Sequence, residues 1–306
     1  MNKNSLYKEI ERWLIKYKKN SVKYSSYNRF ISALRLIGRY DISEMPPSDI
    51  TTDDLQIFVN TLVADEYSKE TIKKTYRLVT EYLDHCLCIG TIDRAVHKGV
   101  KLPKESSVLA KKRKIIAYDD SEQYRLCQAL EDGDNICWKA AILMLETGMR
   151  IGEVMALDWR DIDWTKRSIW IHKTTVRCTP YDENYVQDDP KTPSSVREIP
   201  LSMKAQKLLK GLMKYGLDGF IFHYPNGDPL RYDCMKYWIK EACKEAGVKY
   251  HGLHVFRHTF ATNCYYKGCD VKLLSKMLGH ANISTTYNMY IHLYGDALEE
   301  MRKIVD

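Results

Sequence analysis

The sequence predicts a mainly α-helical protein of two domains, with a small antiparallel β-sheet in the C-terminal domain. Apolar residues recur at helical spacing through residues 5–104, whereas short period-two segments fall only within residues 162–200. With 306 residues, 44% apolar and 28% charged, the chain is long enough for two ordinary hydrophobic cores. The predicted divisions are an N-terminal four-helix bundle (1–104), a linker (105–118), a second domain (119–292) and a tail (293–306).

Four helices are predicted in the first domain from their apolar stripes. The first two stripes are Ile10, Trp13, Leu14 and Tyr17, then Tyr27, Phe30, Ile31, Leu34 and Ile37. After a break at Pro46, Thr51 or Thr52 is expected to cap the third helix. Ser68 is expected to cap the fourth, which ends at Gly90.

The second domain is predicted to alternate buried helices with short strands. Helices are expected around Leu126 and over 137–145, 151–157, 202–216 and 232–246, and strands over 162–163, 168–172 and 196–200. The turn at 147–150 places Arg150 between two buried helices. Gly279 is expected to end a helix that begins near Asp270, and a further short helix is expected over 283–289.

The segment from His254 to Tyr290 carries groups suited to attack on a phosphodiester. His254 and Arg257 are three residues apart, so they project from one face of a helix, and Gly279 places His280 in the following turn. A guanidinium fits phosphate oxygens, and imidazoles donate to them or move protons. A tyrosine with an ordinary pKa of about 10 needs such positive surroundings to act as a nucleophile at neutral pH.

These residues resemble the C-terminal motif of tyrosine recombinases, the family of phage and transposon integrases. The motif is His254-x-x-Arg257, Leu278-Gly-His280 and Tyr290. Two further family boxes lie upstream, Thr-Gly-Met-Arg150-Ile-Gly-Glu153 and the segment 190–201, Pro-Lys-Thr-Pro-Ser-Ser-Val-Arg-Glu-Ile-Pro-Leu. The resemblance implies a catalytic set of Arg150, Lys191, His254, Arg257, His280 and the nucleophile Tyr290.

Several of these assignments have alternatives. Lys173 competes with Lys191, and Tyr287, interpreted as a packing residue, competes with Tyr290. Arg150 is alternatively a structural arginine paired with Glu153 or Asp158. His258 and His292 are interpreted as having local hydrogen-bond partners and not as catalytic.

The resemblance also covers the first domain, which is similar to the core-binding (SAM-like) bundle of these enzymes. It implies a two-domain DNA clamp, and the formal charge of +7 is compatible with a polyanionic partner. The predicted phosphate contacts are Lys69, Lys73, Lys74 and Arg77 in the fourth helix, and Lys111, Lys112, Arg113 and Lys114 in the linker. Solvated charged surfaces are the alternative for both groups.

The implied function is site-specific recombination through a 3′-phosphotyrosyl intermediate, without a metal or cofactor, for integration and excision of a mobile genetic element. The implied partners are double-stranded DNA recombination sites, further copies of the chain forming a tetramer on DNA, and an accessory DNA-bending or directionality protein. Leu298, Met301 and Ile304 at helical spacing indicate a tail exchanged between protomers. Alternatives are a chromosome-dimer resolvase, a type IB topoisomerase-like enzyme and a DNA-binding protein without catalysis.

Composition also narrows the cellular setting. Nine cysteines without a CxxC pair favour free thiols in a reducing compartment. Neither a membrane-length apolar run nor a signal peptide is present, so a cytoplasmic protein is predicted. Because the chain begins almost directly with the core-binding helices, a separate N-terminal arm-binding domain is not expected.

Overall fold

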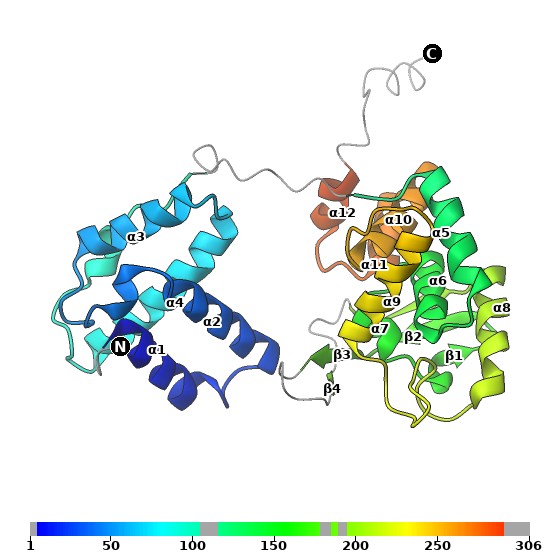
Figure 1. Cartoon of the computed structure of the whole chain (residues 1–306), viewed down its shortest axis with the longest axis horizontal. Coiled ribbons are helices and arrows are strands. Elements are labelled where there is room, and N and C mark those ends of the chain that lie inside the picture. Colours follow the sequence, from blue (N-terminus) through cyan, green and yellow to red (C-terminus); the bar gives the residue numbers. More distant parts are fainter. Residues whose placement is uncertain (1–4, 105–115, 178–184, 189–194, 291–306) are drawn as a thin grey trace, which may run out of the picture. The chain divides into compact units, whose positions relative to one another are not determined.

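The computed structural model describes residues 5–104, 116–177, 185–188 and 195–290. The chain divides into two compact units, Met1–Arg113 and Lys114–Asp306. Each unit has a hydrophobic core of its own. Helices dominate both units, and the strands lie in the second (Figure 1).

The first unit is the helical bundle that the sequence predicts. Its α-helices are α1 (Leu6–Trp13), α2 (Tyr24–Ile37), α3 (Thr52–Ala64) and α4 (Lys69–Cys88). A π-helical turn, Leu14–Lys18, continues α1, and 3-10 turns cover Asp41–Glu44 and Val96–Gly99.

Side-chain caps fix where α3 and α4 begin. The Thr51 hydroxyl accepts a hydrogen bond from the Asp54 backbone N–H at 3.2 Å, and the Asp54 carboxylate accepts one from the Thr51 N–H at 2.9 Å. The Ser68 hydroxyl accepts from the Thr71 N–H at 3.2 Å. Gly90, with φ of 74°, follows the end of α4. The predicted caps and the glycine stop are therefore confirmed.

The core of the bundle draws on all of these helices. Buried residues include Ile10, Leu34, Leu55, Phe58, Leu62, Ile72, Val79 and Leu83. Tyr17, which the sequence stripe places here, is 45% exposed, so that prediction is wrong. The π-helical turn explains this exposure. In it the Lys19 N–H donates to the Leu14 carbonyl at 2.9 Å, and this wider turn rotates the side chains that follow away from the buried face.

The second unit has eight α-helices among the described residues, and most of them pack around α6. They are α5 (Asp120–Asp132), α6 (Ile136–Thr147), α7 (Ile151–Met155), α8 (Met203–Leu212), α9 (Tyr232–Glu245), α10 (His254–Tyr266), α11 (Val271–Leu278) and α12 (Ile283–Tyr290). Helix α6 is apolar on most of its circumference and packs against α5, α7, α8, α9 and α10.

The strands form two small antiparallel sheets. One has the order β1-β2-β5, from β1 (Ile162–Asp163), β2 (Ser168–Ile171) and β5 (Arg197–Pro200). The other pairs β3 (Thr174–Arg177) with β4 (Tyr185–Asp188). The strands predicted from the sequence, over 162–163, 168–172 and 196–200, do not include the segment 185–188 that forms β4. The pairing with β3, not a hydrophobic pattern, makes this segment a strand.

Gly152 allows β3 to lie directly on α7. A Cβ atom at Gly152 would be 2.5 Å from the Thr174 hydroxyl oxygen and 2.8 Å from the Thr175 carbonyl oxygen. The β3–β4 pair is thereby seated beside the turn that carries Arg150.

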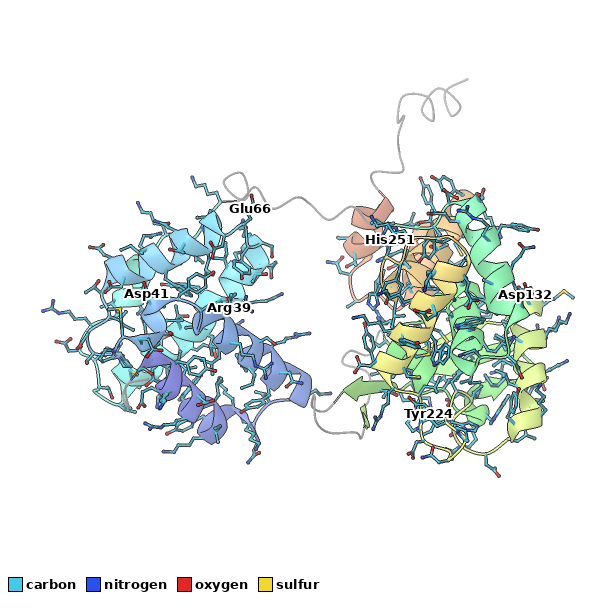
Figure 2. All side chains as sticks on the ribbon, in the orientation of Figure 1. Arg39, Asp41, Glu66, Asp132, Tyr224 and His251 are labelled. Carbon is cyan, nitrogen blue, oxygen red and sulfur yellow. The ribbon has the colours of Figure 1, made fainter. Side chains whose placement is uncertain are left out.

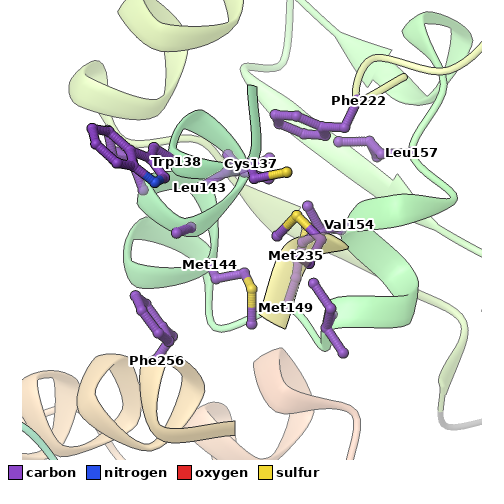
Figure 3. Packing of buried hydrophobic residues seen from close by; sticks show 14 of the residues in the cluster. Cys137, Trp138, Leu143, Met144, Met149, Val154, Leu157, Phe222, Met235 and Phe256 are labelled. Atoms are coloured by element: carbon purple, nitrogen blue, oxygen red, sulfur yellow. The ribbon is translucent and has the colours of Figure 1, made fainter. Parts of the chain in front are cut away.

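The core of the second unit joins α6 to α10. Figure 3 shows Leu143 and Met144 of α6, Met149 from the turn after it and Phe256 of α10 among the buried side chains. The helix that carries His254 and Arg257 is therefore fixed on α6, which is largely buried.

Tyr118 belongs to this core, although the sequence predicts it at the end of the linker. Its side chain is buried, its ring meets Phe256 edge to face at 5.9 Å, and its backbone N–H donates to the Thr259 hydroxyl at 3.0 Å. The ring of His251, labelled in Figure 2, lies 6.1 Å away. Contacts distant in sequence thus place this tyrosine in the second unit.

Candidate active site

Arg257 projects from the buried face of α10 toward the ends of two other helices. The residue is 4% exposed, and its terminal nitrogens donate to the Gly148 carbonyl at 3.0 Å and to the Leu278 carbonyl at 2.5 Å. These carbonyls lie at the C-terminal ends of α6 and α11. A cation near such carbonyls is favoured by the helix dipole, so the guanidinium is held firmly.

Gly148 makes this convergence possible. It has φ of 65°, in the left-handed region, and caps the end of α6. A Cβ atom there would be 2.3 Å from a Phe260 ring carbon and 3.1 Å from a Leu278 methyl carbon. Only glycine therefore satisfies both the turn and the close approach of α10 and α11.

Arg150 follows in the same turn and remains partly open to solvent. Its side chain is 33% exposed; it donates to a Glu153 carboxylate oxygen at 2.8 Å and to the Gly279 carbonyl at 3.0 Å. The predicted alternative of pairing with Glu153 is thus part of the geometry. A guanidinium carries five N–H donors, so this pairing is compatible with donation to a phosphate.

Glu153 is the buried anion of the site. Burial by itself would raise the pKa of its carboxyl, but hydrogen bonding and charge from Arg197, then from Arg150, lower it to about 2. The carboxylate is therefore ionised at neutral pH. Its side chain is 4% exposed and accepts hydrogen bonds from the guanidiniums of Arg150 and Arg197.

His280 stands in the turn between α11 and α12, as the sequence predicts. Asp270 caps α11 through the Leu273 N–H at 2.9 Å, and Gly279, with φ of 65°, ends the helix. The His280 Nδ1 atom lies 2.7 Å from the hydroxyl of Thr286, a fully buried residue of α12. Burial, followed by the charges of nearby arginines, lowers the pKa of His280 to about 4, so the imidazole is neutral at neutral pH.

His254 opens α10 one turn before His258. Desolvation, and then the charges of Arg257 and Arg150, lower the pKa of His254. The two imidazole rings are 6.4 Å apart. His258 is interpreted above as locally satisfied, but its buried Nδ1 atom has no hydrogen-bond partner among the described residues, which corrects that interpretation.

The structure describes only the backbone of the predicted nucleophile and nothing of the predicted lysine. Tyr290 ends α12, and its side chain lies outside the described residues. Lys191 also lies outside them, as do His292 and the tail. Tyr287 is 47% exposed, so its interpretation as a packing residue is wrong.

The competing lysine occupies a different environment. The ammonium of Lys173 lies 3.0 Å from an Asp161 carboxylate oxygen and 3.9 Å from one of Asp158. Its side chain is 12% exposed. An ammonium held by two buried carboxylates is poorly suited to a mobile proton transfer to DNA.

Sequence patterns alone do not place two residues of the site. The pattern assigns Arg197 only to a strand, yet its guanidinium donates to both Glu153 carboxylate oxygens, at 3.0 and 2.8 Å. It assigns Thr286 only to a short helix, without its contact to His280. An arginine at an inward position of a predicted strand is the available signal for the first residue; the second has none.

The predicted DNA contacts of the first unit lie on one helix. In α4, Lys73, Lys74 and Arg77 are exposed, and Lys69 is half-buried. Two pair along the helix, Lys74 with Glu70 at 3.5 Å and Arg77 with Glu81 at 2.8 Å. Such exposed pairs are worth at most about 1 kcal/mol, so a phosphate can replace them. The basic run 111–114 lies outside the described residues.

Two further kinds of feature are absent from the described residues. No cluster of three or more His, Cys, Asp or Glu side chains there could hold a metal ion. Within the same residues, no helix combines the length and apolar character needed to cross a membrane.

Comparisons with known proteins agree with this fold. The model of the phage integrase family matches residues 118–296. The ICEBs1 integrase of Bacillus subtilis (strain 168) is 28% identical, over 81% of this chain and 75% of that protein. The transposase from transposon Tn916 of Enterococcus faecalis is 25% identical, over 94% of this chain and 74% of its own.

Solved structures show the same fold. The Tn1549 transposon integrase in complex with a circular intermediate DNA has a TM-score of 0.79 at 20% identity, covering 98% of this chain and 99% of that one. A lambda integrase tetramer bound to a Holliday junction has a TM-score of 0.65 at 19% identity, covering 92% and 77%. The fold is that of a tyrosine recombinase. The chain belongs to the phage integrase family.

Proposed function

We propose that this recombinase cleaves and rejoins DNA strands through a 3′-phosphotyrosyl intermediate on Tyr290, in integration and excision of a mobile genetic element. The observation that carries the proposal is the convergence of Arg150, Arg257 and His280 at the end of α11. The helix that follows, α12, ends at Tyr290. The integrases and transposases among the relatives support the mobile-element role.

The two arginines supply fixed positive charge for the phosphate. In the reaction, the Tyr290 oxygen bonds to phosphorus while the bond from phosphorus to the 5′ oxygen breaks. The phosphorane oxygens carry growing negative charge, and preorganised donors stabilise it without reorganisation. Glu153 and the carbonyls of Gly148, Leu278 and Gly279 provide that preorganisation, because they hold both guanidiniums.

The histidines and Lys191 have the remaining roles. A neutral His254 can accept the phenol proton, and Lys191 can give a proton to the leaving 5′ oxygen. A Thr286 hydroxyl that donates to Nδ1 of His280 leaves the imidazole proton on Nε2, where it can donate to a phosphate oxygen. Rejoining is the same reaction in reverse, with a 5′ hydroxyl as nucleophile.

Double-stranded DNA is the proposed partner, contacted by α4 and the basic run 111–114. The complexes of the Tn1549 integrase with DNA and the lambda integrase tetramer on a Holliday junction support DNA binding and assembly as a tetramer. An accessory DNA-bending or directionality protein is a further proposed partner.

Covalent capture tests the function directly. A binding site for the protein is first selected from a randomised duplex library. A nick is then placed within that site so that the cleaved fragment diffuses away. The expected result is a protein–DNA adduct that survives denaturation and disappears on digestion with a protease. Binding without any adduct on nicked duplexes would favour the alternative of a DNA-binding protein without catalysis.

DNA binding should weaken steeply with salt, partly through the basic run 111–114. Replacing these four residues with glutamine should reduce the slope of log K against log salt, by about 0.9 for each phosphate that the chain no longer neutralises. Binding constants measured between about 50 and 200 mM salt give the slope.

A control with the same loss of charge separates this effect from net charge. It replaces four cations that already have carboxylate partners, Arg12, Arg160, Lys166 and Lys204. We expect the control to alter the slope less. Equal slopes in the two variants would mean that the run is only a solvated linker.

The tail should matter for assembly and not for binding. Three apolar side chains, Leu298, Met301 and Ile304, are worth only a few kcal/mol, too little to hold an oligomer in solution against the cost of association. The free chain should therefore sediment as a monomer. Deletion of 295–306 should spare binding to one site and impair pairing and recombination of two. Recombination at the normal rate by the truncated chain would show that the tail acts only locally.

A further inference from the structure

Three arginines from different elements share the C-terminal end of α11. Arg197 of β5 donates to the Met277 carbonyl at 2.6 Å, Arg257 to the Leu278 carbonyl at 2.5 Å and Arg150 to the Gly279 carbonyl at 3.0 Å. The last carbonyls of a helix have no partner within it, and the helix dipole favours cations there. The end of α11 is thus a common anchor for elements far apart in the sequence.

Arg197 makes the most hydrogen bonds that link the parts of this arrangement. It is 7% exposed, and it bonds to both oxygens of Glu153, to Met277 and to the Ser195 carbonyl at 3.1 Å. Glu153 in turn accepts from the side chain and the backbone N–H of Arg150, both at 2.8 Å. Arg197 therefore holds the carboxylate that orients Arg150.

The same residue connects two other parts of the site. It opens β5, six residues after Lys191 in the sequence. Its contact with the Met277 carbonyl fixes the last turn of α11, from which the chain passes directly to His280. A buried guanidinium with these partners is placed to act through its neighbours and not by touching DNA.

We propose that Arg197 is a positioning residue for strand cleavage: through Glu153 and the end of α11 it holds Arg150 and the His280 turn in register with the phosphate. This inference rests on the proposed function. It predicts that loss of the paired hydrogen bonds from Arg197 to Glu153 impairs the chemical step while DNA binding is retained. Arg150 and His280 would remain present but would no longer be held in place.

The test compares Arg197→Lys and Arg197→Met with the wild-type chain. Lysine keeps the buried charge but cannot reproduce the fork to both carboxylate oxygens. Both variants should bind the selected duplex as the wild type does. Single-turnover formation of the covalent adduct should fall about 10- to 100-fold, the size expected for a misplacement of about 1 Å. The rate of adduct formation should fall less in Arg197→Lys than in Arg197→Met.

The pH profile provides a readout that a merely structural role would not move. Arg197 is the main group that lowers the pKa of Glu153, against burial, which raises it. In Arg197→Met the pKa of Glu153 should therefore rise, and Glu153 should protonate, releasing Arg150, at a higher pH than in the wild type. The acidic limb of the cleavage profile should shift toward neutral pH.

Arg160→Met is the control. It also removes an arginine that is paired with a buried carboxylate, that of Asp158, but the Arg160 side chain is 85% exposed. It should cleave at the wild-type rate. If Arg197→Met fails to fold, the double variant Glu153→Gln/Arg197→Met removes the uncompensated buried charge. That variant should fold, cleave slowly and show a flattened acidic limb.

Two results would overturn the inference while leaving the proposed function intact: folded Arg197 variants that form adduct at the wild-type rate, or a loss fully explained by weaker DNA binding. A wild-type rate in the folded double variant would have the same meaning. If the wild-type chain itself forms no adduct, the proposed function fails, and the role of Arg197 in cleavage fails with it.

Discussion

Tyr290→Phe will bind the selected duplex as tightly as the wild-type chain and form no covalent adduct. Only the phenolic oxygen can attack phosphorus, and a phenyl ring has no nucleophilic atom in its place. The remaining ring is almost the same size, so the packing of α12 should be retained. Mobility-shift binding and adduct formation on the nicked duplex measure the two properties separately.

Tyr287→Phe is the matched control, one turn earlier in the same helix. Tyr287 is exposed, so its hydroxyl is accessible and must be tested as a nucleophile. We expect this variant to form adduct normally. An adduct that persists in Tyr290→Phe and is lost in Tyr287→Phe would transfer the role of nucleophile to Tyr287.

Arg150→Ala and Arg257→Ala will each slow cleavage by about 10²- to 10³-fold, since each removes preorganised positive charge from the transition-state phosphate. Their effects on folding should differ. Arg257 is buried against two helix-end carbonyls, whereas Arg150 is 33% exposed. Leaving buried acceptors unpaired costs about 1–3 kcal/mol each, so Arg257→Ala should also lower the melting temperature.

The cleavage rate should therefore be compared where both variants are folded, as judged by circular dichroism. Because fixed arginine charges are proposed to neutralise the phosphate, cleavage should also continue in excess EDTA. Wild-type cleavage rates in both alanine variants, or a strict requirement for Mg²⁺, would contradict this mechanism.

Local patterns in the sequence predict most of the helices and the order of the motifs. The caps at Thr51, Ser68 and Asp270 and the stops at Gly90 and Gly279 depend on hydrogen bonds within a few residues, which sequence spacing encodes. Where local hydrogen bonding departs from the ordinary α-helix, as in the π-helical turn that exposes Tyr17, the periodic pattern fails.

The amino-acid sequence alone indicates the class of the protein, the helical division of its chain and the residue types for phosphodiester chemistry. How those residues are held depends on the tertiary structure. Arg150 meets a carbonyl 129 residues away, and Arg197 meets Glu153 across 44 residues. Strand β4 likewise exists through its pairing with β3. Contacts of this range depend on which helix ends and strands the cores bring together, and no local periodicity records that.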